Sequence, residues 1–244
     1  MRLLVTRPEP DALKMRGVLE KLGCEGVVEP LLRAAYENCD PIEIGGAQAL
    51  IATSRSALVA LKAQGLLARA RELPLFAVGG ATAREARALG FALVVAGAAG
   101  AHELVTHIVS VADPAAGLLV HLAGEPRAVD FAVELEPHGF RVVAPVVYRM
   151  LAAAALRDTT VEQLAGGEID GVILMSPRTA VIYARLMRKH GLAMTARALT
   201  HFCFSPAVAG QLKSLGRVPI EVAERPRLEE LLALVAARAA ESQP

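Results

Sequence analysis

LLVTRPEPDALKMRGVLEKLGCEGVVEPLLR (residues 3–33) reappears later in the chain as LLVHLAGEPRAVDFAVELEPHGFRVVAPVVYR (residues 118–149). Each copy begins with a short apolar run, continues through a polar loop and an amphipathic segment, and reaches a glycine. Such runs are typical of buried parallel strands, such segments of helices, and such glycines of helix C-termini. The repeat pairs Val5 with Val120, Leu19 with Leu135, Gly23 with Gly139, and Pro30 with Pro145.

Two further blocks of the chain are also repeated. LIATSRSAL (50–58) resembles VILMSPRTAV (172–181), and LFAVGGATAREARALG (75–90) resembles HFCFSPAVAGQLKSLG (201–216). The second block leads in both places to a short strand and a closing helix. Strands alternate with helices along the whole chain, which predicts an α/β fold with parallel sheets and right-handed crossovers.

The order of the blocks predicts an exchanged domain organisation. Along the chain the long block is followed by the two shorter blocks, and this order then repeats. The first long block is therefore not preceded by the two shorter blocks, and the last two shorter blocks are not followed by a long block. We therefore expect residues 1–33 and 150–244 to form a discontinuous terminal domain, and residues 38–145 an inserted middle domain, with linkers at 34–37 and 146–149. Each domain then has five strands, the number in a flavodoxin-like doubly wound sheet. A plain duplication without exchange is the alternative.

The composition is that of an ordinary folded protein, with 54% hydrophobic and 21% charged residues among 244. The net charge is +1 and no run of Lys and Arg occurs, which argues against nucleic-acid and membrane-surface partners. Apolar runs are too short for a signal peptide or a membrane span, so we expect a cytoplasmic protein. The three cysteines form no CxxC pair, and no metal site is expected.

Small, hydroxylated and cationic residues follow the predicted strands. Ligands of open α/β sheets bind beyond the carboxyl ends of the strands, where helix N-termini favour anions. The candidate binding residues are Thr6, Arg7, Ser176, Arg178 and Ser205 in the terminal domain, and Thr53, Ser54, Arg55, Gly79, Gly80, Thr82 and Arg127 in the middle domain. Two interpretations stay open: a rim that binds carboxylates, or helix N-caps and solvated surface arginines. His121 is at a predicted strand end, yet a core or surface role is expected for all six histidines.

Common active-site signatures are missing from the sequence. It has no GxSxG elbow, no Walker loop and no complete GxGxxG. A non-catalytic two-domain binding protein for a small anionic ligand therefore remains an alternative to an enzyme. A flavin-binding flavodoxin is a third possibility, which zero Trp and 4% aromatic residues disfavour.

Several motifs, in their order and spacing, resemble the uroporphyrinogen-III synthase family. They are TRP (6–8), TSRSA (53–57), VGGATAREARALGF (78–91), PVVYR (145–149) and MSPRTA (175–180). The resemblance covers nearly the whole chain. It implies two flavodoxin-like domains joined by a two-stranded linker, with the active site in the cleft between them.

The resemblance also implies an activity. The family closes the linear tetrapyrrole hydroxymethylbilane to uroporphyrinogen III, losing water and inverting ring D through a spiro intermediate, as a monomer without a cofactor. The implied partners are this small-molecule substrate and, transiently, hydroxymethylbilane synthase. Tyr148 matches the family tyrosine that assists departure of the hydroxyl. Thr53, Ser54 and Thr82 match residues that face the cleft, and backbone amides around Gly79 and Gly80 match a carboxylate-binding turn.

The sequence departs from the family pattern at two turns. Ser205-Pro206-Ala207-Val208 stands where the family commonly carries threonines, and Pro226-Arg227 stands where it carries Pro-Thr. Both changes remove hydroxyl groups from the rim of the terminal domain. Backbone contacts, a charge supplied by Arg227, or a weak or inactive relative would each account for the departure.

Overall fold

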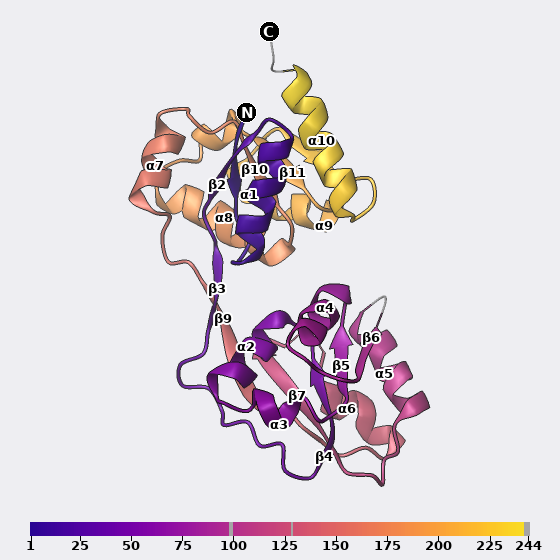
Figure 1. Cartoon of the computed structure of the whole chain (residues 1–244). Helices are drawn as coiled ribbons and strands as arrows, with labels where there is room; N and C mark the ends of the chain where they lie inside the picture. Colours follow the sequence, from indigo (N-terminus) through magenta and orange to yellow (C-terminus); the bar gives the residue numbers. More distant parts are fainter. Residues whose placement is uncertain (98–99, 128, 242–244) are drawn as a thin grey trace. The chain divides into compact units, whose positions relative to one another are not determined.

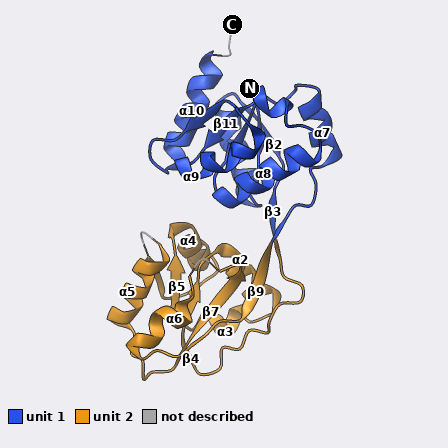
Figure 2. Cartoon of the chain, turned by 180° about the vertical axis from the view of Figure 1, so that it is seen from behind, with its two compact units in different colours: residues 1–33, 151–244 blue, residues 34–150 orange. Residues whose placement is uncertain are grey.

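The chain folds into alternating strands and helices that form two compact units. The computed structural model describes residues 1–97, 100–127 and 129–241. Unit 1 comprises Met1–Arg33 with Leu151–Pro244, and unit 2 comprises Ala34–Met150 (Figure 2). The α/β class with parallel sheets is confirmed. Among the described helices, none has the length and apolar character needed to cross a membrane.

Unit 1 is built around one parallel sheet with the strand order β12-β11-β10-β1-β2. Three of these strands, β2, β10 and β11, are labelled in Figure 1. Its strands are β1 (Arg2–Val5), β2 (Glu25–Val28), β10 (Gly171–Leu174), β11 (Thr200–Cys203) and β12 (Ile220–Val222). Its helices are α1 (Asp11–Lys21), α7 (Asp158–Ala165), α8 (Pro177–Lys189), α9 (Pro206–Ala209) and α10 (Leu228–Glu241), with short 3-10 turns η2 (Thr195–Arg197) and η3 (Gly210–Leu215). The first strand of the chain therefore lies inside a sheet made mostly by its last third.

Both faces of the sheet in unit 1 are buried. Leu3 and Val5 of β1 pack with Leu19 of α1 and Val235 of α10 in one apolar cluster. Leu4, which alternates to the opposite face, is also fully buried. Burial on both faces is why the strands read as continuous apolar runs rather than as alternating ones.

Unit 2 carries a sheet with the strand order β3-β9-β7-β4-β5-β6, in which β8 also pairs with β7. Its strands are β3 (Leu32–Ala35), β4 (Ala47–Ala52), β5 (Leu75–Val78), β6 (Val94–Gly97), β7 (Leu118–Glu125), β8 (Val142–Val143) and β9 (Val146–Ala152). Its helices are α2 (Arg55–Ala63), α3 (Leu67–Ala70), α4 (Gly80–Ala88), α5 (Ala101–Val111) and α6 (Phe131–Leu135), followed by η1 (Glu136–His138). The boundary between the units falls within or beside β3 and β9, which pair with each other.

Helices cover the sheet of unit 2 from both sides. Leu58 of α2 and Ala83 of α4 pack on one face together with Leu50 and Val120. On the opposite face, α5 and α6 pack against Ile51 and other residues of β4, β5 and β7. The helices that follow β4 and β7 thus lie on opposite faces, which opens a crevice at the carboxyl ends of these two neighbouring strands.

The two sheets have the same arrangement of repeated blocks. With β3 and β9 left out, the remaining strands of each unit are numbered along the chain. Those of unit 1 then lie in the order 2-1-3-4-5, and those of unit 2, from β6 to β8, in the order 3-2-1-4-5. Equivalent strands have the same neighbours in both sheets, but the order in which the chain visits them is circularly permuted. In both sheets the first strand of the long repeat block, β1 or β7, lies beside the strand that precedes α8 or α2.

One predicted pairing of repeat positions, Val5 with Val120, is wrong by one residue. Val5 pairs with Ile173 across the sheet of unit 1, whereas the equivalent Ile51 in unit 2 pairs with His121 rather than Val120. Val5 and Ile173 share one apolar cluster, but Val120 faces the side opposite to Ile51. A shift of one residue reverses the face of a strand. Val5 is therefore equivalent to His121.

A buried carboxylate joins the two pieces of unit 1. Glu29, 3% exposed, follows β2, and its carboxylate accepts hydrogen bonds from Nε of Arg157 at 2.8 Å and Oγ1 of Thr160 at 2.5 Å. Thr160 is itself buried in α7. An unpaired hydroxyl at this depth loses its hydration without compensation, so the contact fixes α7 against the N-terminal segment.

Glu29→Ala should destabilise unit 1 by about 2 kcal/mol, because it leaves the Thr160 hydroxyl and the Arg157 guanidinium without this partner. Urea unfolding followed by circular dichroism measures the effect. The matched control is Glu25→Ala, whose ion pair with Arg2 is exposed and whose loss should cost less than about 1 kcal/mol. Equal losses in the two variants would contradict the role assigned to Glu29.

Candidate active site

A cavity of about 350 Å³ lies at the carboxyl end of the sheet in unit 2. It is lined by Thr53, Val78, Ala101, His121, Gly124, Pro126, Arg127, Val129 and Tyr148. The lining residues come from the ends of β4 and β5, from β7 and the segment after it, from β9 and from the start of α5. In a doubly wound sheet this is the point where strand order reverses, and ligands bind there.

Tyr148 of β9 forms part of the cavity wall. Its side chain is 6% exposed, and its hydroxyl oxygen accepts a hydrogen bond from Oγ of Ser54 at 2.9 Å. Because Ser54 donates its proton to this oxygen, the phenolic O–H of Tyr148 is available to donate to another acceptor. The arrangement presents an oriented hydrogen-bond donor at the cavity.

Ser54 and its repeat partner Ser176 use their hydroxyls differently. Both stand at the N-cap of a helix in extended conformation. Oγ of Ser176 accepts a hydrogen bond from the backbone N–H of Thr179 at 3.1 Å, which is the usual capping contact. Ser54 makes no capping bond with its side chain and turns to Tyr148 instead. The cap interpretation therefore fits Ser176, whereas Ser54 serves the tyrosine.

Gly124 makes room for the tyrosine ring. It lies directly beside Tyr148 in the pairing of β7 with β9. A Cβ atom at this position would come within 2.2 Å of Cζ and 2.3 Å of the hydroxyl oxygen of Tyr148. Any side chain at residue 124 would therefore displace the ring from its present place.

A second phenol, Tyr36, lies near Tyr148 but outside the cavity lining. Burial raises the pKa of Tyr36, a hydrogen bond with Ser56 acts in the opposite direction, and Tyr148 adds to the rise. Sequence analysis did not single out Tyr36, because nothing in its local pattern separates it from a packing residue.

Arg127 supplies the positive charge at the cavity. Its guanidinium donates to the carbonyl oxygen of Ala144 at 3.0 Å and lies 3.7 Å from the carboxylate of Asp130. The side chain is about one third exposed. The hydrogen bond to Ala144 orients the guanidinium. An anionic group in the cavity can therefore bind to this guanidinium.

Other predicted residues of unit 2 lie around the cavity without lining it. Gly79 is the N-cap of α4, Gly80 begins this helix, and Thr82 in its first turn is buried. Val78, immediately before this turn, does line the cavity. Arg55 begins α2 next to Ser54. The N-termini of both helices favour a negative group at this edge of the sheet.

The predicted residues of unit 1 lie at the carboxyl edge of its own sheet. The hydroxyl of Thr6 is fully buried and donates to the carbonyl oxygen of Ile173 at 2.8 Å. Arg7 pairs with Asp11 at 3.1 Å, and Ser205 occupies the N-cap of α9 without a capping bond from its side chain. Arg178 is exposed at the start of α8. The side-chain groups of Thr6 and Ser176 are thus already used within the fold.

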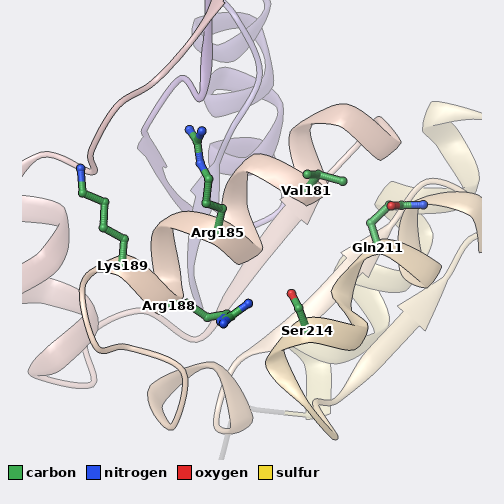
Figure 3. Close-up of a pocket in the computed structure, with 6 residues that line it drawn as sticks. All are labelled: Val181, Arg185, Arg188, Lys189, Gln211 and Ser214. Carbon is green, nitrogen blue, oxygen red and sulfur yellow. The ribbon is translucent and has the colours of Figure 1, made fainter.

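A second hollow, of about 650 Å³, lies on unit 1 and contains none of the predicted residues. It is lined by Val181, Arg185, Arg188, Lys189, Gln211 and Ser214 (Figure 3). Arg185 and Lys189 extend away from Ser214 and donate to the carbonyl oxygens of Ala153 and Ala154 at 2.8 Å each. These hydrogen bonds fix the segment after β9. Arg188 is then the main cationic side chain left to the hollow.

His121, for which a core or surface role is expected from the sequence, also lines the cavity. It is 2% exposed, and its ring contacts Phe131 edge to face at 4.8 Å between centroids. Burial first, and then the charge of Arg127, lower the pKa of His121 to about 4, although Asp130 acts in the opposite direction. Its signal in the sequence is a single polar residue within the apolar run LLVHLA.

No group of three or more His, Cys, Asp or Glu side chains within the described ranges is arranged to hold a metal ion. The site therefore offers hydrogen-bond donors, one guanidinium and helix N-termini. Such groups can bind and orient an anionic ligand and can assist the departure of a hydroxyl.

Comparisons with known proteins show the family and the fold of this chain. The family model described as uroporphyrinogen-III synthase HemD matches residues 14–233. A crystal structure of uroporphyrinogen-III synthetase from Helicobacter pylori superimposes with a TM-score of 0.65 at 17% identity, covering 97% of this chain and 98% of the other. A mutant uroporphyrinogen III synthase from Thermus thermophilus gives 0.50 at 18% identity, covering both chains completely. No curated protein matches the chain in sequence. Because the family model spans most of its length, this chain belongs to the uroporphyrinogen-III synthase HemD family.

Proposed function

We propose that this protein closes hydroxymethylbilane to uroporphyrinogen III, with loss of water and inversion of ring D. Membership of the family supports the reaction. The observation that carries it to particular residues is the hydroxyl of Tyr148, held by Ser54 on the wall of the cavity in unit 2. The alternative of a non-catalytic binding protein is not favoured by this membership.

A weakly acidic group of the protein is sufficient for the reaction. An electron-rich pyrrole expels the terminal hydroxyl, and a phenol that donates a hydrogen bond to that oxygen helps it leave as water. The substituted carbon of ring D attacks the electrophilic methylene of the azafulvene to give the spiro intermediate. Fragmentation, reclosure and loss of a proton complete the ring, so that the net change is one water lost. The principal task is to hold the chain in the folded arrangement that leads to this closure.

We place substrate carboxylates near Arg127 and Thr53, which line the cavity, and near the turn from Gly79 to Thr82 and Arg55 beside it. Arg7, Arg178 and Ser205 of unit 1 remain proposed contacts, as do the backbone groups at Thr6 and Ser176. Charge-assisted contacts of this kind suit a polycarboxylate.

The domain organisation belongs to the same proposal. Two flavodoxin-like domains, residues 1–33 with 150–244 and residues 38–145, would be joined by linkers at 34–37 and 146–149. The strand order 2-1-3-4-5 of unit 1 and its circular permutation in unit 2 support this assignment.

The proposed reaction is tested by a coupled assay. Purified hydroxymethylbilane synthase generates the substrate, this protein is added, and the oxidised porphyrin isomers are separated by chromatography. We expect isomer III to predominate. Isomer I alone, from protein shown to be folded, would refute the activity.

Tyr148→Phe should lower kcat about 100-fold, because it removes the donor that assists the leaving hydroxyl and keeps the packing of the ring. Isomer III formation at saturating substrate measures it. The control is Tyr36→Phe, which removes a nearby phenol that does not line the cavity and should leave kcat within about twofold. A kcat in Tyr148→Phe equal to that of the unmodified protein would reduce Tyr148 to a packing residue.

Gly124→Ala should also lower kcat, because the new methyl group would displace the ring of Tyr148. Overpacking of this kind costs about 1–3 kcal/mol of stability. The double variant Gly124→Ala with Tyr148→Phe should be no slower than Tyr148→Phe alone, since both changes act through one hydroxyl.

Gly17→Ala is the matched control for the added methyl group. A Cβ at Gly17 meets nothing within 4 Å, and the residue lies in α1 of unit 1. It should keep kcat and gain about 1 kcal/mol of stability from helix propensity. Additive losses in the double variant of Gly124 and Tyr148 would count against the steric mechanism.

A further inference from the structure

The imidazole of His121 is buried and has no hydrogen-bond partner within the part of the chain that the structure describes. It lies on β7 beside Ile51 of β4, and its side chain is 2% exposed. Neither Nδ1 nor Nε2 has a hydrogen-bond partner among the described residues. Buried polar atoms are almost always paired, because an unpaired one gives up hydration without return. The ring also lines the cavity, so a ligand there can supply the missing partner.

The fold itself does not require a histidine at this position. The equivalent residue in unit 1 is Val5, which pairs with Ile173 as His121 pairs with Ile51. Val5 is fully buried in the apolar cluster of that unit. An aliphatic side chain thus satisfies the same place in the other copy of the repeat. The unpaired imidazole of His121 therefore lowers the stability of the fold, and packing does not explain why a histidine is present here.

The other deeply buried histidine shows how a structural imidazole is satisfied in this chain. His201 of β11 is 0% exposed. Its Nδ1 lies 3.0 Å from the carbonyl oxygen of Pro219, and its Nε2 lies 3.2 Å from the hydroxyl of Tyr183. Both ring nitrogens of His201 are therefore paired within unit 1. His121, at nearly the same depth, has neither contact.

We propose that His121 and Arg127 form a subsite that binds one carboxylate of the tetrapyrrole, an inference that takes its ligand class from the proposed function. Both side chains line the same cavity. A neutral imidazole offers one N–H donor, and a guanidinium offers charge and further donors. A carboxylate, with two acceptor oxygens, can accept a hydrogen bond from each of the two side chains at once.

The charges around His121 fit this subsite. The pKa of His121 is lowered to about 4 by burial and by Arg127, so the ring is neutral at pH 7. Asp130 opposes the effect of Arg127, but its Oδ1 accepts the backbone N–H of Ala132 at the start of α6 at 3.0 Å. Its other oxygen lies 3.7 Å from the Arg127 guanidinium in a partly exposed ion pair, and the guanidinium keeps further N–H donors for a ligand carboxylate.

Nuclear magnetic resonance of protein labelled with 15N-histidine tests the contact directly. The probe is uroporphyrin III, the stable oxidised form of the proposed product. A carboxylate beside the ring favours its protonated form, so binding should raise the pKa of His121 above its value in the free protein. The signal is assigned by its loss in His121→Leu. An unchanged pKa at saturating uroporphyrin III, or no binding by the unmodified protein, would overturn the subsite.

Variants separate binding from packing. His121→Leu should weaken binding of uroporphyrin III about tenfold, measured by porphyrin fluorescence, while the melting temperature stays the same or rises. His121→Gln, which keeps a donor and an acceptor, should bind more tightly than His121→Leu. In the control His201→Leu, the melting temperature should fall because Tyr183 loses its partner, and the affinity should not change. Equal affinity in His121→Leu and the unmodified protein would overturn the proposal.

The isomer assay distinguishes failure of the subsite from failure of the proposed function. Isomer III from the unmodified protein, with unchanged KM in His121→Leu, would leave the function standing and remove the subsite. Isomer I alone, together with a His121 pKa that rises on binding uroporphyrin III, would remove the function and leave a carboxylate-binding subsite.

Discussion

The pairing of β1 with β10 is the constraint on which the rest of the structure depends. Leu3, Leu4 and Val5 align with residues 171–173 in a parallel register, and β1 lies between β10 and β2. The first 33 residues supply only two strands to this sheet, so they cannot bury both of their faces alone. The chain must therefore return to its own beginning, and all of unit 2 is carried between the two crossings at β3 and β9.

Much of this fold could be predicted because the repeat and the apolar runs can both be recognised in short stretches of the sequence. Gly23 and Gly139, paired by the repeat, both end a helical segment with φ near 70–80°, a conformation that glycine adopts readily. The alignment of β1 with β7 was less secure. Short aliphatic runs match one another equally well when shifted by a residue, and only the sheet register shows that Val5 corresponds to His121.

The candidate site was harder to predict because its residue types are ambiguous. A serine at the start of a helix reads as a cap, and Ser54 and Ser176 look alike in sequence. Their roles differ because Tyr148, nearly a hundred residues away along the chain, reaches Ser54. The residue type of His121 is ambiguous in the same way. A histidine in an apolar run usually has a partner in the core, and only the hydrogen bonds of the structure show that this one has none among the described residues.

The duplicated halves locate the site by their differences. Each half needs the same core, caps and strand pairings, so equivalent positions that differ in chemistry mark where one half has acquired another role. In unit 1 the two positions are filled by Val5, packed in the core, and Ser176, bonded to its own helix. In unit 2 they carry His121, which lines a cavity, and Ser54, which bonds to Tyr148. Ser54 follows the carboxyl end of β4 and His121 lies in the middle of β7, and the fold alone explains neither departure.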